Sequence, residues 1–305
     1  MSKKDVEQKP SETALMGALH RAIANKVLGS QRFGSDNLAE YFLPPHYKFF
    51  IGFKKIRTNS KNKFNKFLPG MHEYIIARTA FFDNVFLEAL CNQIPQIVLL
   101  GAGYDSRAYR FANLKEATKI IELDIAPTQN RKKLCLKKAQ IDIPKNVTLV
   151  PINFNEESLL SVLEKAGYDK REKTLFLWEG VIYYLDSESV DATLEFVSQS
   201  SHSESIIAFD YIITSSEKNN TYYGSKEFFQ TMKKHHANER LIFGIDEGGA
   251  ELFFRQRGLK MIDHWDNEEI ERTFALNDDG SSLGKITGTF CFAMASPYNN
   301  RSRKL

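Results

Sequence analysis

The sequence is poor in cysteine and has no long apolar run. Its three cysteines, an odd number, stand at the widely spaced positions Cys91, Cys135 and Cys291. That spacing suits neither a disulfide framework nor a cysteine-based metal site, and it is typical of thiols in a reducing compartment. No apolar run approaches the roughly 20 residues of a membrane-spanning helix, and the polar first ten residues lack the apolar core of a signal peptide. We therefore expect a cytoplasmic protein without a membrane segment.

A large net charge is also missing. The 41 basic and 38 acidic residues leave a formal net charge of +3, which provides no overall attraction for nucleic acid. The length of 305 residues is enough for one large domain or two small ones. We see neither an internal repeat nor a linker, and therefore predict a single domain.

Acidic residues are absent between Glu40 and Glu73. Within this stretch, residues 44–70 interleave basic residues with aromatic ones. Such a mixture can stack on bases and hold phosphates, or it can touch an anionic membrane. The interpretation that we favour is a cap helix and a mobile loop over an active site, with the lysines on the solvent-facing side.

The third glycine of a dinucleotide-binding turn is missing as well. Residues 96–101 read as a buried parallel strand that runs into a tight turn with Gly101 and Gly103. In place of the third glycine the turn carries Asp105 and Arg107. An acid there repels a phosphate but suits a cationic ligand, such as the amino end of a methionine group. These residues favour S-adenosylmethionine over NAD, and a tight turn without a ligand is the alternative.

A second apolar strand follows about 20 residues later, over 119–124. It ends in the acids Glu122 and Asp124. An acid at this place in a nucleotide-binding α/β sheet takes the two ribose hydroxyls of a nucleoside. The strand over 147–153 ends in Asn153, followed by Phe154, which can form an adenine slot. A turn-forming Asn and a core Phe are the alternative.

Two further strand ends carry acids and tyrosines. The strand over 174–178 runs into Glu179, with Tyr183 and Tyr184 close behind, and the strand over 205–212 includes Tyr211. Open α/β sheets bind ligands at the carboxyl ends of their strands, so these side chains are candidates for a substrate pocket. Ordinary core or rim tyrosines are the alternative. The adjacent histidines His235 and His236 point apart on a helix and have no third ligand nearby, so no metal site is predicted.

The remaining pattern divides the chain into a lead, a cap, a core and a tail. We predict a disordered lead over 1–10, a helical cap and lid over 11–92, an α/β core over 93–298 and a basic tail over 299–305. Two more strands are predicted over 260–265 and 288–295, which makes seven in one sheet. Helices are predicted from residue 11 and over 36–43, 72–93, 127–139, 157–166, 188–200, 225–236 and 248–257.

Taken together, these motifs resemble the S-adenosylmethionine-dependent methyltransferases of the leucine carboxyl methyltransferase type, in particular their bacterial branch, which includes polyketide O-methyltransferases. The resemblance runs from about residue 11 to 296. Its motifs are Thr13-Ala14-Leu15 with Arg21-Ala22, Ala77-Arg78-Thr79 with Phe82-Asp83, the glycine turn 100–107, Glu122-Leu123-Asp124 with Ile125-Ala126-Pro127, and residues 178–185.

This resemblance implies a seven-stranded Rossmann-like methyltransferase sheet, mostly parallel with the last strand antiparallel, with helices on both faces and an N-terminal helical cap. The implied cofactor is S-adenosyl-L-methionine. Arg78 would bind its methionine carboxylate, and Glu179 would lie near its amino group and sulfonium. Gly101 and Gly103 would let the cofactor approach the turn. Asp124 or Glu122 would bind the ribose, and Asn153 and Phe154 would line the adenine pocket. Two positions depart from the family pattern. Asn153 stands where Asp is common, and Ile182 stands where Thr or Ser is usual.

The expected reaction is in-line displacement of the sulfonium methyl by an oxygen of a small-molecule acceptor. A carboxylate acceptor needs no general base. A phenol or alcohol needs one, and no histidine stands at a strand end, so the sequence favours a carboxylate. We take Tyr183, Tyr184 and Tyr211, with Glu179, as candidates for the acceptor side.

Other functions stay open at this stage. They are carboxyl methylation of a tRNA nucleoside or of a protein C-terminus, and a non-catalytic module that keeps the cofactor pocket. The glycine turn disfavours an NAD-dependent oxidoreductase. The sequence does not indicate an oligomeric state.

Overall fold

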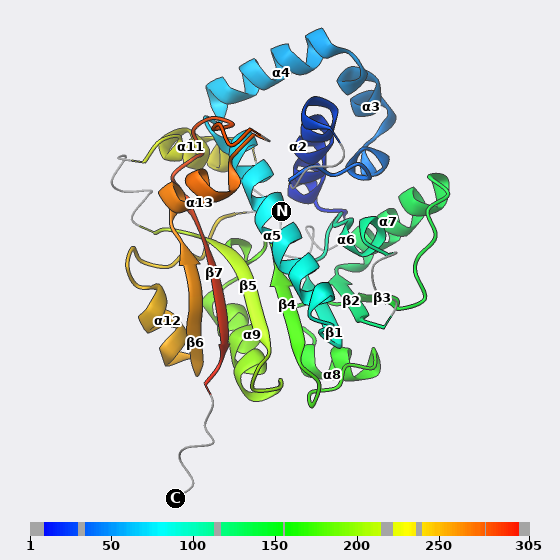
Figure 1. The fold of residues 1–305 in the computed structure, drawn as a ribbon, viewed down its shortest axis with the longest axis vertical. Helices are drawn as coiled ribbons and strands as arrows, with labels where there is room; N and C mark the ends of the chain where they lie inside the picture. The colour runs from blue at the N-terminus through cyan, green and yellow to red at the C-terminus, as the bar shows by residue number, and fades with distance from the viewer. Residues whose placement is uncertain are drawn as a thin grey trace, which may run out of the picture.

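The structure is a computed structural model that describes residues 9–29, 34–112, 117–154, 156–214, 222–235, 240–277 and 279–298. A seven-stranded sheet runs through the middle of the molecule in the order β3-β2-β1-β4-β5-β7-β6 (Figure 1). β7 is antiparallel to both of its neighbours, and the other six strands run in one direction. The predicted sheet is therefore confirmed. Its strands are β1 (Gln96–Leu100), β2 (Lys119–Asp124), β3 (Val147–Pro151), β4 (Thr174–Trp178), β5 (Ile206–Ile212), β6 (Leu259–Trp265) and β7 (Phe290–Pro297).

The central strand β1 is buried along its whole length. Its Val98 pairs with Ile121 of β2 on one side and with Phe176 of β4 on the other. A strand covered on both faces has no polar side to present, and this is why its sequence is a continuous apolar run instead of an alternating one. β1 therefore delivers the glycine turn to the middle of the sheet's carboxyl edge.

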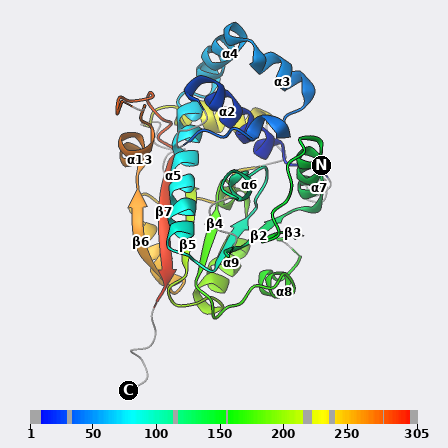
Figure 2. The same cartoon turned by 45° about the vertical axis from the view of Figure 1, so that its right-hand side comes forward.

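Helices cover both faces of the sheet. α5 (Met71–Cys91) crosses one face and contacts β4 and β5, while α9 (Ser187–Gln199) lies on the other (Figures 1 and 2). Phe81 of α5 stacks on Phe292 of β7 with ring centroids 4.6 Å apart. This contact and its aromatic neighbours hold α5 against the sheet and so set the height of its polar residues. The other core helices are α6 (Arg107–Arg110), α7 (Ala126–Lys138), α8 (Leu159–Lys165), α11 (Ser225–His235), α12 (Ala250–Gln256) and α13 (Asn267–Phe274).

A helical cap lies over the carboxyl ends of the parallel strands (Figure 2). It consists of α2 (Glu12–Leu28), the 3₁₀ turn η1 (Ala39–Phe42), α3 (Pro45–Gly52) and α4 (Lys54–Phe67). Ser11 begins α2 by accepting a hydrogen bond from the amide of Ala14, and Pro45 begins α3 at a position that needs no amide donor. The acid-free segment is thus two helices, not the cap helix and mobile loop that the sequence indicated.

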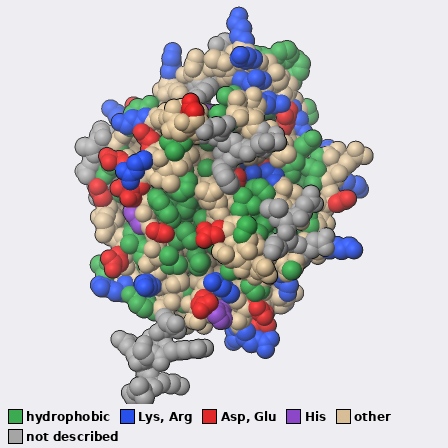
Figure 3. Space-filling view, in the orientation of Figure 1, with side chains coloured by type: hydrophobic (Ala, Val, Ile, Leu, Met, Phe, Trp, Pro, Cys, Tyr) green, Lys and Arg blue, Asp and Glu red, His purple; other side chains and the backbone are tan. Residues whose placement is uncertain are grey.

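The acid-free segment carries its basic residues outward. Lys54, Lys55 and Lys66 of α4 are exposed, and Figure 3 shows Lys and Arg side chains at the top of the molecule, where α4 lies. Phe64 of the same helix turns inward and packs on the core. Among the described residues, no helix combines the length and hydropathy required to cross a membrane.

The predicted element boundaries differ from the structure in several places. β3 ends at Pro151, two residues before its predicted end, and β7 is shifted by two residues toward the C-terminus. The helix predicted over 36–43 is only the turn η1, and α13 was not predicted. Asp266 and Glu269 form a reciprocal capping box at the start of α13, a sequence signal that was available but not used. His236 and the predicted lead 1–8 and tail 299–305 lie outside the described residues.

Candidate functional site

A cavity of about 340 Å³ lies between the carboxyl edge of the sheet and the cap. Its wall comes from the ends of β1, β2 and β4 and from α2, α4, α5 and α11. Most of the predicted site residues line it. They are Arg78, Gly101, Gly103, Asp105, Arg107, Asp124, Phe154, Glu179, Tyr183 and Tyr184. Residues predicted from distant parts of the sequence thus share one space.

The glycine turn fits under its neighbours only without side chains. Gly101 and Gly103 have φ angles of +71° and +48°, in the left-handed region. A Cβ on Gly101 would lie 2.5 Å from Cγ2 of Val181, and one on Gly103 would lie 3.2 Å from Cβ of Ala14. The glycines are therefore required by packing against the β4 loop and α2, in addition to any ligand.

Asp124 holds this turn in place. Its Oδ2 accepts a hydrogen bond of 2.6 Å from the amide of Gly103, and its Oδ1 accepts one of 2.7 Å from the amide of Ile125. Burial raises the pKa of Asp124 to about 6, although the two amide donors oppose the shift. Each carboxylate oxygen has a second acceptor site, so Asp124 is able to bind two hydroxyl groups of a ligand.

Glu122, the alternative ribose acid, does not line the cavity. Its side chain is 1% exposed, and Oε2 pairs with Nζ of Lys132 at 2.6 Å. The hydroxyl of Tyr109 also donates to Oε2, at 3.4 Å. Side chains alternate across a strand, so Glu122 and Asp124 share one face of β2, but only Asp124 stands at the strand's end. Of the two acids, Asp124 alone reaches the cavity.

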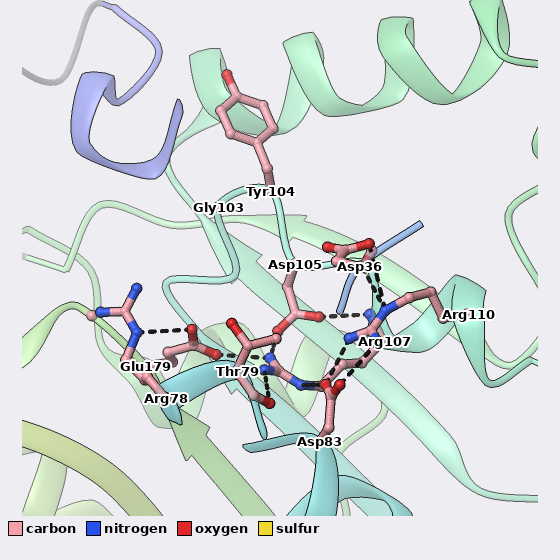
Figure 4. Close-up of polar contacts among 12 residues, drawn as sticks. Asp36, Arg78, Thr79, Asp83, Gly103, Tyr104, Asp105, Arg107, Arg110 and Glu179 are labelled. Carbon is pink, nitrogen blue, oxygen red and sulfur yellow. Dashed lines mark hydrogen bonds and ion pairs between the residues drawn. The ribbon is translucent and has the colours of Figure 1, made fainter. Parts of the chain in front are cut away.

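Arg107 is the centre of a buried ion network (Figure 4). Arg107 is 3% exposed, and its Nε lies 2.8 Å from Oδ1 of Asp83. Its Nη1 lies 2.8 Å from Oε2 of Glu179 and also forms an ion pair with Asp105. Burial opposes the charge on Arg107, but the carboxylates of Asp105, Glu179 and Asp83 outweigh it and raise its pKa. Its hydrogen bonds thus join α5, the glycine turn and the end of β4.

Glu179 continues the network to Arg78. Nε of Arg78 lies 3.1 Å from Oε1 of Glu179, and its Nη1 lies 3.3 Å from Oδ2 of Asp210. Nη1 also donates to the hydroxyl of Tyr183 at 3.2 Å. Burial opposes the charge on Arg78, but Asp210 and the other neighbours raise its pKa well above the usual value. Arg78 is therefore held as a cation in the cavity wall.

Two residues behind this arginine were not assigned to the site from the sequence, although an acid near the end of the strand over 205–212 was noted. Asp210 of β5 is completely buried, and it accepts hydrogen bonds from the hydroxyl of Tyr74 at 2.7 Å and from the amide of Gly180 at 2.6 Å. Tyr74 lines the cavity from α5. Asp210 lies near the end of the apolar strand β5, so an acid close to a strand end, the signal that marked Asp124, is present here too. Tyr74 and Arg78 lie about one turn apart on α5, and only the fold brings both of them to Asp210.

Two predicted residues lie away from the cavity. The hydroxyl of Tyr211 is 2.7 Å from Nε2 of His264 on β6, and Tyr211 is not part of the wall. The backbone amide of Asn153 donates to Oε2 of Glu157 at 2.8 Å, its carbonyl accepts from the amide of Glu157, and Asn153 is not part of the wall. Phe154 lines the cavity without it.

The far end of the cavity is apolar. It is formed by α4, α5, α11 and β7, and the sequence did not predict that these four elements meet at one site. We call this region the apolar end and define it by Phe64, Leu68, Met71, Phe228, Met232 and Phe290. A buried histidine of α2, His20, also lines the cavity. No group of three or more metal-ligating side chains occurs in the part of the chain that the structure describes.

The sheet order, the single antiparallel strand and the cavity at the carboxyl edge define a Rossmann-like methyltransferase fold. A family model of leucine carboxyl methyltransferases matches residues 14–198. The chain therefore belongs to the leucine carboxyl methyltransferase family.

Similar proteins occur in actinobacteria. A protein of Mycobacteroides abscessus, named as a candidate S-adenosyl-L-methionine-dependent methyltransferase, is 30% identical over 174 residues, which are 57% of this chain and 52% of the relative. One of Mycobacterium marinum with the same name is 27% identical over 195 residues, 64% of this chain and 60% of the relative. The chain thus spans between half and two thirds of the length of these relatives.

Two solved structures share the fold. A DUF574 family protein of Streptomyces avermitilis has a TM-score of 0.62 at 11% identity and covers 96% of this chain and 99% of its own. A candidate methyltransferase of Thermobifida fusca has a TM-score of 0.61 at 13% identity and covers 95% of both chains. At these identities the similarity concerns the fold alone.

Proposed function

We propose that this protein is an S-adenosylmethionine-dependent O-methyltransferase that acts on a carboxylate or hydroxyl group of an apolar small molecule. The observation that carries this proposal is the layout of the cavity between the sheet and the cap. Asp124, the candidate ribose acid, stands on the β2 side, and Arg78 and Glu179 stand in the middle. The residues of the apolar end enclose the other side. Family membership supports the methyltransferase part of the proposal, because the relative in Mycobacteroides abscessus is named as a candidate S-adenosyl-L-methionine-dependent methyltransferase.

The residues present fit this cofactor. Asp124 would accept both ribose hydroxyls, and Phe154 with Ile125 would contact the adenine. Arg78 would bind the methionine carboxylate, and Glu179 would attract the amino group and the sulfonium. When bound, the cofactor supplies a methyl group on a sulfonium, with S-adenosylhomocysteine as the leaving group.

The chain's own contribution is positioning and exclusion of water. The ion network fixes Arg78 and Glu179 relative to the glycine turn, so the two ends of the cofactor would be held at a set separation. α2 and α4 cover the cavity, and the apolar end offers few groups for water to bond. The described cysteines are free thiols, which suits a reducing compartment such as the cytoplasm.

Calorimetric titration tests the proposal. Wild-type protein should bind S-adenosylmethionine in the micromolar range and should not bind NAD. Asp124→Ala should abolish the binding, whereas Asp263→Ala, which changes an exposed acid of β6, should leave it intact. Tight binding of NAD, or an Asp124→Ala protein that still binds the cofactor, would contradict the proposal.

One observation favours a second acceptor class, a tRNA nucleoside. Phe49, Phe50 and Phe53 are exposed beside the basic face of α4, an arrangement found in surfaces that bind single-stranded nucleic acid. The apolar end of the cavity favours a small apolar acceptor instead. Affinity for tRNA that falls steeply with salt would support the nucleoside, and salt-independent or absent binding would remove it.

A further inference from the structure

His20 places an imidazole ring in the wall of the cavity. The residue lies on α2, is 4% exposed and contacts the ring of Phe64 of α4 with centroids 4.3 Å apart. Phe64 belongs to the apolar end, so His20 stands on the side where the acceptor is expected, away from Asp124. The sequence had directed attention to histidines at strand ends, and His20 is on a cap helix.

One nitrogen of His20 is engaged by a second histidine. Nδ1 of His20 lies 3.0 Å from Nδ1 of His72 at the start of α5. Such a contact requires one ring to donate a proton and the other to accept it. The tautomer of His20 is therefore coupled to that of His72, and each tautomer gives Nε2 of His20 a different role.

The other nitrogen, Nε2, is buried and makes no hydrogen bond within the described part of the chain. Burial, followed by the charges of His72 and Arg78, lowers the pKa of His20 well below its usual value. Among the described residues, those two groups, both on α5, are the charged or titratable neighbours that act on the ring, and the α4 contact Phe64 is uncharged. The ring is thus neutral at neutral pH, with one nitrogen that lacks a hydrogen-bond partner among the described residues.

The charge pattern of the wall favours a neutral acceptor. The arginines that the described residues contribute to the cavity are Arg21, Arg78, Arg107 and Arg110, and each is already paired with a carboxylate. In the proposed function Arg78 serves the methionine carboxylate of the cofactor, so a carboxylate acceptor would have to displace one of the other buried pairs, which is costly. A hydroxyl on an apolar molecule needs no such displacement, but it needs a partner that takes its proton.

We propose that Nε2 of His20 is this partner, and that the acceptor is an apolar, planar molecule with a phenolic or enolic hydroxyl. His72 is a positioning residue, which accepts the Nδ1 proton of His20 and so leaves a lone pair on Nε2. This inference rests on the proposed function and reverses the preference for a carboxylate that the sequence alone supported.

The step balances in atoms and charge. The hydroxyl oxygen forms a bond to the methyl carbon as the sulfur–methyl bond breaks, and the sulfur keeps that electron pair. The hydroxyl proton passes to Nε2 of His20. One positive charge leaves the sulfonium and one appears on the imidazole, and the products are a methyl ether and S-adenosylhomocysteine.

Nitrogen NMR of the ¹⁵N-histidine-labelled protein with S-adenosylhomocysteine bound tests the tautomer directly. The chain has seven histidines, and the His20 signals are those lost in His20→Phe. We expect a proton on Nδ1 of His20 and none on Nε2, and we expect His72→Asn to redistribute that proton. A proton on Nε2 in the wild type overturns the inference, and so does an unchanged His20 spectrum in His72→Asn.

The acceptor class is tested with 2-naphthol and 2-naphthoic acid, which have the same ring system. With S-adenosylhomocysteine present, 2-naphthol should shift the Nε2 signal of His20, and 2-naphthoic acid should not. His20→Phe should bind 2-naphthol about tenfold more weakly, the loss expected for one hydrogen bond, whereas His202→Phe, outside the cavity wall, should bind it normally. A shift with neither compound, or a stronger response to 2-naphthoic acid, overturns the inference.

The two proposals fail in different ways. If the wild type does not bind S-adenosylhomocysteine, the proposed function itself is wrong. If the wild type binds it and His20 carries its proton on Nε2, only the role of His20 is wrong. Affinity of His20→Phe for S-adenosylhomocysteine reports whether that variant keeps a folded cavity.

Discussion

The amide of Gly103 donates a hydrogen bond of 2.6 Å to Oδ2 of Asp124. The acid at the end of β2 therefore holds the turn at the end of β1, and the amide of Ala102 supports the same junction by donating to the carbonyl of Leu123. A cofactor that bonds Asp124 would also stiffen the glycine turn, because one carboxylate serves both.

Cofactor affinity should depend on pH through Asp124. Its pKa is raised to about 6, so the carboxylate that we propose as the acceptor for the ribose hydroxyls is mostly protonated below that pH. The affinity should be constant above pH 6 to 7 and fall by up to about tenfold per pH unit below it. Titration calorimetry between pH 5 and 8 measures this. Asp124→Asn should bind weakly with a flat profile, and a flat wild-type profile would contradict the assignment.

Arg107 should be a major determinant of stability. Arg107→Ala leaves Asp83, Asp105 and Glu179 without their shared cation, and such loss of a buried partner costs about 3–5 kcal/mol. Denaturant unfolding measures the free energy. Arg171→Ala, which breaks an exposed pair with Asp169, is the matched control and should leave stability unchanged. Equal effects of the two substitutions would mean that the network does not stabilise the fold.

Gly101 and Val181 should be energetically coupled. Gly101→Ala introduces a Cβ 2.5 Å from Val181 and a side chain at a φ angle of +71°, which should cost about 1–3 kcal/mol. In the double variant Gly101→Ala/Val181→Ala the clash disappears and the φ strain remains. A double-mutant cycle in denaturant should therefore show less destabilisation than the sum of the single variants, and strict additivity would exclude the clash.

Glu122 should matter for folding and not for cofactor binding. Glu122→Gln leaves the buried Lys132 without its carboxylate and should lower the unfolding free energy by several kcal/mol. The Glu122→Gln protein that remains folded should bind S-adenosylmethionine with wild-type affinity, because Glu122 does not line the cavity. Thermal unfolding and calorimetry on the same sample separate the two effects. Lost affinity with unchanged stability would return Glu122 to the ribose site.

Much of the cofactor side was predictable from local pattern. An apolar strand that ends in glycines, and a second that ends in an acid, specify backbone geometry within a few residues, so Gly101, Gly103 and Asp124 could be placed correctly in one cavity. The expectation that side chains at the carboxyl ends of strands line the cavity does not hold for Glu122 and Tyr211. Position along a strand does not say which side chain faces the cavity and which faces a buried partner.

The sequence by itself determined the seven strands, the glycine turn and the family, because these depend on apolar periodicity and on short motifs. Only the tertiary structure decided the partners of Arg107, the role of Asp210 and the meeting of His20 with His72. The contacts of Arg107 with Asp83, of Asp210 with Arg78 and of His20 with His72 join residues 24, 132 and 52 positions apart. A charge or a ring has no preferred partner until the sheet and the cap bring the two together.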